Sequence, residues 1–85
     1  MEELIKAGWL RTTHRGYNCA AKTYTWLGVY GDFRIYADGS GAVDVTVDKR
    51  LVATVSISIA HISFVDIENS CIDIIRQAYA KYLGI

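Results

Sequence analysis

LVATVSISI, at residues 51–59, is the stretch that decides the fold of this chain. Its larger apolar side chains alternate with smaller or polar ones, and this period of two predicts a strand with one buried face. Further along, residues 66–83 carry an apolar stripe at helical spacing, made of Ile67, Cys71, Ile74, Ile75, Ala78 and Tyr82. Because each apolar face needs cover, we expect this strand and this helix to pack against each other.

Three more strands are expected upstream of this one. They are predicted at residues 19–30, 33–37 and 42–47, from β-branched and aromatic enrichment and, in the third, strict alternation. Turns are predicted at residues 31–32, 38–41 and 48–50. Connections this short join only antiparallel neighbours, so the strands form a meander.

The sequence therefore predicts an α+β fold, a four-stranded antiparallel meander sheet packed against one C-terminal helix, within a single domain over residues 1–85. Residues 2–10 are expected to form a short N-terminal helix or an arm laid on the sheet, and residues 12–18 a loop. Asp66 is placed to cap the main helix at its start and Gly84 to close it.

Short turns also predict which residues share a sheet face. A two-residue turn at Gly31-Asp32 sets Tyr30 opposite Phe33, and three-residue turns at 39–41 and 48–50 set Ile35 opposite Val45 and Val45 opposite Ala53. The helix side then holds Trp26, Tyr30, Phe33, Ile35, Val45, Val55 and Ile57. The opposite side holds Leu27, Val29, Arg34, Tyr36, Asp44, Thr46, Val52, Thr54 and Ser56. A first turn one residue longer would move Tyr24, Trp26 and Tyr30 to the outside.

Charge and hydropathy narrow the function classes. Nine acidic residues balance nine basic ones, which gives no overall electrostatic footprint for nucleic acid. Apolar runs are far shorter than the roughly 20 residues that a membrane span needs. Glu2 and Glu3 follow Met1 where a secretory signal would be basic and then apolar, so we expect a cytoplasmic protein.

The residues that carry chemistry elsewhere are scattered here. His14, Cys19, His61 and Cys71 lack the close-spaced pairs of a zinc site, and neither Cys-His pair has a recognisable third partner for nucleophilic catalysis. We expect two buried free thiols, no metal, no cofactor and no enzymatic activity.

The surface of the predicted sheet is the better candidate for function. Its outer face adds apolar area, which exposure to solvent alone does not favour, at Leu27, Val29, Tyr36 and Val52. We expect partner contacts on this face at Leu27, Val29, Arg34, Tyr36, Asp44, Thr46, Val52 and Thr54. Arg34 and Tyr36 also suit a nucleic-acid stacking surface, although Asp44 on the same face opposes one.

The strand at residues 51–59 is expected at a sheet edge. From Leu51 to Val65 only His61 is ionisable, and an edge free of charge invites another strand to pair with it. Three covers are open, the N-terminal arm, a second copy of the chain and a foreign protein, and a homodimer is the simplest closed arrangement.

In size and layout the chain resembles the small inhibitor proteins that phages and mobile elements use against host defence, anti-CRISPR proteins among them. The resemblance covers the whole chain and rests on the meander, the turn from Ala37 to Gly41 and the terminal helix. It implies stoichiometric blockade of a nuclease or CRISPR-type effector complex through surface contacts. The alternative is a small nucleic-acid-binding accessory or regulatory protein.

Overall fold

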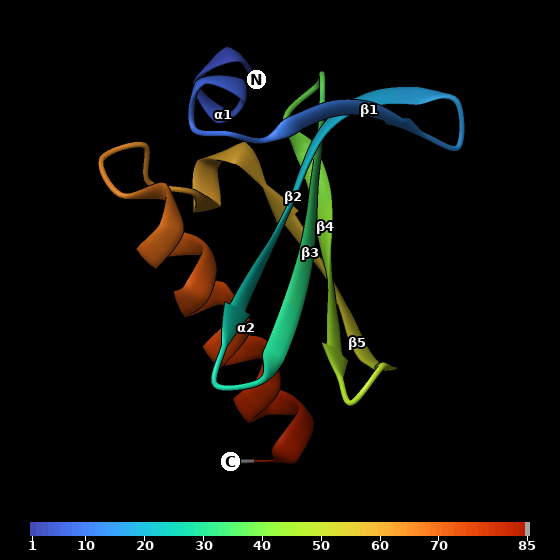
Figure 1. Cartoon of the computed structure of the whole chain (residues 1–85), viewed down its shortest axis with the longest axis vertical. Coiled ribbons are helices and arrows are strands. Elements are labelled where there is room, and N and C mark those ends of the chain that lie inside the picture. The colour runs from blue at the N-terminus through green and yellow to red at the C-terminus, as the bar shows by residue number, and fades with distance from the viewer. Residues whose placement is uncertain (85) are drawn as a thin grey trace.

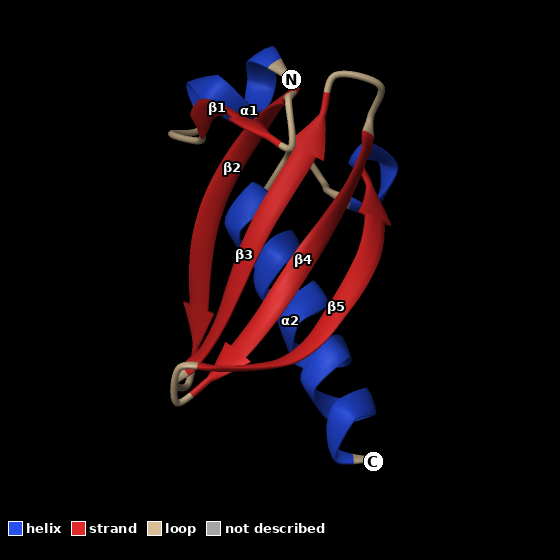
Figure 2. Ribbon diagram, turned by 90° about the vertical axis from the view of Figure 1, so that its right-hand side faces the viewer, coloured by secondary structure: helices blue, strands red, loops and turns tan. Residues whose placement is uncertain are grey.

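The computed structural model describes residues 1–84 and contains one antiparallel sheet with helices on a single side (Figures 1 and 2). The elements are α1 (Glu2–Lys6), β1 (Leu10–His14), β2 (Tyr17–Trp26), β3 (Val29–Tyr36), β4 (Ser40–Val47), β5 (Arg50–Ser58), the 3-10 turn η1 (Ile59–His61) and α2 (Ile67–Leu83). The strands lie side by side in chain order. The predicted α+β meander with a terminal helix is confirmed, but the sheet has five strands and not four.

The fifth strand is β1, which falls largely in the segment predicted as a loop. Arg15 and Gly16 both adopt positive φ angles, 54° and 84°, and this two-residue turn suits the twist of a hairpin. It sets His14 opposite Tyr17 and Leu10 opposite Ala21. Sequence reasoning missed β1 because four of its five residues are polar, so apolar and polar residue types do not alternate along it. Of the two alternatives for residues 2–10, the short helix is the one observed.

The first predicted turn was misplaced. The β2–β3 turn is Leu27-Gly28, with φ angles of 48° and 82°, whereas Gly31 and Asp32 lie inside β3. Trp26 therefore lies opposite Val29, and Tyr30 belongs to β3 and points to the outer side. Gly31 is needed within the strand because Ile75 of α2 packs directly against its backbone.

The next two turns were also shifted, with different consequences. The β3–β4 connection is residues 37–39, so Ile35 lies opposite Gly41 and not Val45. The β4–β5 turn has two residues, Asp48-Lys49, both at positive φ, and Val47 lies opposite Arg50 rather than Leu51. A β-bulge then leaves Val52 without a partner and restores the predicted pairing of Val45 with Ala53.

The helix α2 has the predicted boundaries and caps. The Asp66 carboxylate accepts a hydrogen bond from the Asn69 backbone N–H, and Gly84 ends the helix in the left-handed conformation. Its stripe buries Cys71, Ile75 and Ala78 against the sheet. In Figure 2 the helix crosses behind the strands diagonally, and its last turns run out past the β5 edge.

The core lies between α2 and the sheet face that it covers. Tyr24, Phe33, Ile35, Val43, Val45 and Ile57 come from the strands, and Leu4 and Trp9 close the end near the N-terminus. The Trp9 indole N–H donates a 3.1 Å hydrogen bond to the Tyr24 hydroxyl, and its ring meets Phe33 edge-on. The N-terminal arm thus lies on the helix side (Figure 1) and leaves the other face of the sheet uncovered.

Candidate functional site

The uncovered outer face of the sheet carries most of the predicted contact residues. The register places Asp44 opposite Asp32 and Thr54, and Thr46 opposite Tyr30 and Leu51, all on the side away from α2. Arg34 and Tyr36 alternate with the buried Phe33 and Ile35 and so lie on the same side. Arg34, Tyr36, Asp44, Thr46 and Thr54 therefore share the outer face, as the sequence predicted.

Three other predicted contact residues do not join them. Leu27 lies in the β2–β3 turn and is 86% exposed at the end of the sheet. Val29 is 3% exposed on the helix side, because the true turn comes four residues earlier than predicted. Val52, at the bulge, packs partly against the core. The predicted apolar outer patch is therefore not formed by these residues.

A chain of polar contacts runs across the middle of the outer face. Arg34 donates to the Asp44 carboxylate at 2.8 Å, and the Thr54 hydroxyl donates to the other oxygen of that carboxylate at 2.9 Å. The Arg34 side chain is only 18% exposed, so this ion pair is partly shielded from water. Arg34 and Asp44 thus neutralise each other within the protein, whereas Asp32, opposite Asp44, accepts a hydrogen bond from the Thr23 hydroxyl and forms no ion pair within residues 1–84.

The pKa values of the pair follow from these contacts. Burial raises the pKa of the Asp44 carboxyl, but hydrogen bonds from Arg34 and Thr54 outweigh that effect and hold the pKa below its usual range. The hydrogen bond to Asp44 raises the pKa of the Arg34 guanidinium. Both groups remain charged at neutral pH, and the pair is electrostatically neutral toward a partner.

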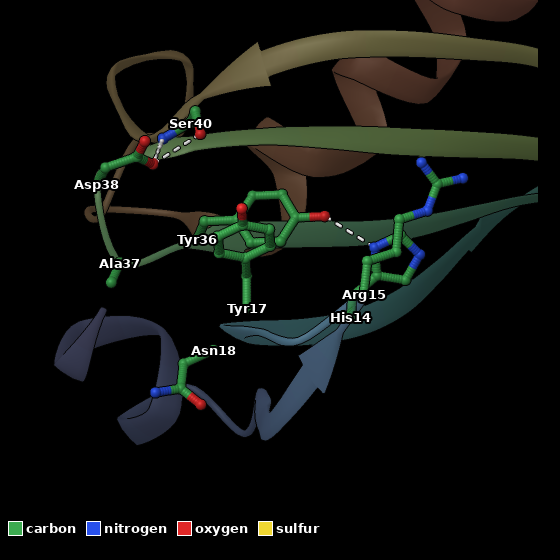
Figure 3. Close-up of a pocket in the computed structure, with 8 residues that line it drawn as sticks. All are labelled: His14, Arg15, Tyr17, Asn18, Tyr36, Ala37, Asp38 and Ser40. Atoms are coloured by element: carbon green, nitrogen blue, oxygen red, sulfur yellow. Dashed lines mark hydrogen bonds between the residues drawn. The ribbon is translucent and has the colours of Figure 1, made fainter.

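At one end of this face the β1–β2 hairpin and the β3–β4 turn enclose a hollow of about 650 Å³ (Figure 3). His14 Nδ1 lies 2.9 Å from the Tyr36 hydroxyl, and the Tyr17 ring meets the Tyr36 ring edge-on at 6.5 Å between centroids. Arg15, Asn18, Asp38 and Ser40 complete much of its rim. Sequence reasoning missed this site because His14 and Tyr17 reach it only through the pairing of β1. The Arg15-Gly16 dipeptide was the one available signal.

Exposed aromatic side chains accompany this polar surface. Tyr17 is 70% exposed beside the hollow, and Tyr30 is 48% exposed at the other end of β3. The neighbouring acids are held by hydroxyl groups, Asp32 by Thr23 and Asp38 by Ser40. The backbone and hydroxyl of Ser40 also lower the pKa of the Asp38 carboxyl. The outer face thus combines ordered polar groups with two large aromatic contacts.

Neither the two cysteines nor His61 lines this hollow. Both thiols are free and buried, and burial raises the pKa of the Cys71 thiol to about 12. His61 accepts a hydrogen bond from the Ser58 backbone N–H through its Nδ1. Within residues 1–84, no three His, Cys, Asp or Glu side chains gather as metal ligands would. None of the helices in this range combines the length and the apolar character that crossing a membrane requires.

Comparison of the chain with known protein families, curated proteins and solved structures finds no match in any of the three.

Proposed function

We propose that this chain is a non-enzymatic binding protein that uses the outer face of its sheet to dock on another protein. Its resemblance to phage anti-defence proteins makes the proposal more specific: the chain acts in the cytoplasm as a stoichiometric inhibitor of a nuclease or a CRISPR-type effector complex. The observation that carries the proposal is the outer face itself, which α1 and α2 leave uncovered, which holds the preformed ion pair of Arg34 and Asp44, and which has exposed tyrosines at its two ends.

The energetics of interfaces favour a surface of this kind. Tyrosine is enriched among the residues that dominate binding energy, because it brings a large apolar area with little loss of side-chain entropy. Tyr30 stands on β3 with β2 and β4 paired on either side of it, and Tyr17 stands at the end of the β1–β2 hairpin, paired with His14. The ion pair between Arg34 and Asp44 is formed before binding, so a partner does not have to order it.

The same geometry weighs against a phosphate-binding role for Arg34. A guanidinium reads phosphates or stacks on bases when its donors and its plane are free. Here one donor is taken by Asp44 and most of the side chain is covered. Nucleic-acid binding is the second candidate, because the hollow places Arg15 and His14 beside the exposed Tyr17 ring.

The test compares the wild-type chain with Tyr17→Ala, Tyr30→Ala and the double variant. Purified candidate nucleases and effector complexes are titrated with each protein, and cleavage is followed. We expect inhibition that saturates near one inhibitor per complex and weakens about tenfold or more with each tyrosine removed. A matched control is Tyr82→Ala, which removes a similarly exposed ring from the helix side.

A salt titration separates the second candidate. DNA and RNA binding is measured between about 50 and 200 mM salt, where phosphate contacts lose affinity steeply. Tight nucleic-acid binding with a steep salt slope, lost in Arg15→Ala, would replace the protein-inhibitor proposal. If the double tyrosine variant still inhibits fully, the outer face is not the surface through which the chain inhibits its partner.

A further inference from the structure

The free edge of β5 is a short, bounded pairing surface. Across residues 1–84, β5 is paired with β4 alone. At one end the bulge at Val52 interrupts the ladder, and at the other His61 Nδ1 takes the Ser58 backbone N–H at 3.1 Å. Between these two stops lies the stretch from Ala53 to Ile57, which contains no charged side chain.

The backbone direction within this stretch follows from two hydrogen bonds. The Ile59 N–H donates to the Gly39 carbonyl, beside the start of β4, at 2.7 Å, whereas the Ser58 N–H turns the opposite way to His61. Because successive residues of a strand direct their N–H and C=O groups to opposite sides, Ser56 and Thr54 point away from β4. Their backbone groups are free to pair with a new strand.

Beneath this edge lies a groove of about 450 Å³ between β5 and α2. Val55 and Ile57 line it from the strand, and Ile74, Gln77, Asp73 and Lys81 line it from the helix. Asp73 and Lys81 stand four residues before and four residues after Gln77. The outward flank of α2 therefore carries opposite charges placed symmetrically about Gln77.

We propose that the occupant of this edge is a second copy of the same chain. The two copies are related by a two-fold axis perpendicular to the sheet, which passes beside Val55 of β5 and beside Gln77 of α2. Antiparallel pairing about Val55 sets Thr54 of each copy opposite Ser56 of the other as hydrogen-bonded pairs, and Val55 opposite its own equivalent. It also keeps the helix side of both sheets on one side, as the period of two requires.

Other centres fit less well. An axis at Thr54 brings the Val52 bulge opposite Ser56, and an axis at Ser56 sets Thr54 opposite Ser58, whose N–H is already bonded to His61. The axis at Val55 also brings the two α2 helices antiparallel, so Asp73 of each copy faces Lys81 of the other. The pairing of the strands and the charges of the helices thus fit the same two-fold axis. A two-fold contact uses the same surface on both copies, so the assembly is a dimer.

The proposal is tested by molar mass in solution, measured by light scattering across concentrations up to about 100 µM. We expect a mass near twice the 9.5 kDa of one chain. Ser56→Pro removes an N–H that points away from β4 and is expected to raise the dimer Kd at least about a hundredfold, while Ser56→Thr keeps the N–H and the dimer. Circular dichroism confirms that both variants are folded.

A charge exchange gives an independent arm. Asp73→Lys and Lys81→Asp each set like charges together and are expected to weaken the dimer about fivefold to tenfold, and combining them is expected to restore it. Glu3→Lys on α1 is the control for the change of net charge in Asp73→Lys. A wild-type monomer throughout, a dimer indifferent to Ser56→Pro, or singles that the double variant does not rescue would overturn the proposal. Inhibition by an obligate monomer would leave the outer-face function standing.

Discussion

Replacing Gly31 with alanine is expected to destabilise the protein by driving α2 away from the sheet. A methyl group at this position would lie 2.6 Å from both Cγ1 and Cδ1 of Ile75, and 3.1 Å from Cε1 of Phe33. Apolar carbons settle at about 3.5 to 4.0 Å, so the new methyl overlaps Ile75 by about 1 Å. Ile75 is fully buried and has little room to rotate.

The size of the effect follows from two opposing terms. Overpacking of a well-filled core costs about 1 to 3 kcal/mol. Alanine also narrows the unfolded ensemble relative to glycine, which returns about 0.4 to 1 kcal/mol, and Gly31 has no positive φ that alanine would strain. The net loss is about 1 to 2 kcal/mol, which lowers the Tm by roughly 4 to 16 °C in a domain of this size.

The assay is urea unfolding followed by tryptophan fluorescence, because Trp9 is buried against the same core. Ile75→Ala alone is expected to cost about 2 to 5 kcal/mol through its cavity. In the double variant the alanine methyl fills part of that cavity. The double variant should therefore lose about 1 to 2 kcal/mol less stability than the sum of the two single losses. Strict additivity, or a neutral Gly31→Ala, would refute the close approach of α2 to β3.

Three further predictions concern the polar chain, the thiols and the arm. Asp44→Asn is expected to cost about 2 kcal/mol above pH 5, because it leaves a partly buried guanidinium without its counter-charge. The pKa of Asp44 is lower in the folded than in the unfolded protein, so its carboxylate stabilises the fold above the unfolded pKa near 4. This stabilisation is lost as the pH falls through the folded pKa. The stabilities of the wild type and Asp44→Asn, compared by urea unfolding, should therefore converge in acid. Cys71, whose pKa of about 12 keeps it protonated, and the buried Cys19 should react with iodoacetamide at pH 8 only as fast as the protein opens, with denaturant accelerating both; rapid labelling of the native protein would contradict their burial. Trp9→Phe and Tyr24→Phe should each cost about 1 kcal/mol in thermal unfolding and together little more than one alone, since both remove the same hydrogen bond.

The sequence was most informative where a structural property depends on near neighbours. The caps of α2, the alternation of β5 from Ala53 to Ile57 and the middle of the helix stripe are local patterns that the structure confirms. The ends of both patterns were wrong: Leu51 lies beyond the bulge on the outer side and is 63% exposed, Ile59 belongs to η1, and Tyr82 is 54% exposed. The β2–β3 turn was mispredicted because both Leu27-Gly28 and Gly31-Asp32 offer a glycine. Gly31 is used instead to admit Ile75, from a helix far along the chain, and no local pattern reports such a contact.

The candidate site shows the same division. The faces of Arg34 and Asp44 follow from the alternation of their strands, but their pairing at 2.8 Å does not. The hollow beside Tyr17 depends on β1, an exposed strand whose existence is decided by its turn and by the edge of β2 that it covers. Val52 does not lie on the predicted face because a β-bulge leaves it unpaired, and no residue type at this position indicates the bulge.

The meander order also decides how the chain reaches its structure during synthesis. Each strand pairs with the one made just before it across a turn of two or three residues, so the entropy lost in closing each loop is small. The apolar side of the sheet nevertheless stays open to water until α2 has left the ribosome. A nascent chain halted before Asp66 would expose the apolar sheet face that α2 later covers. At this stage the protein is most prone to aggregation and to binding by chaperones.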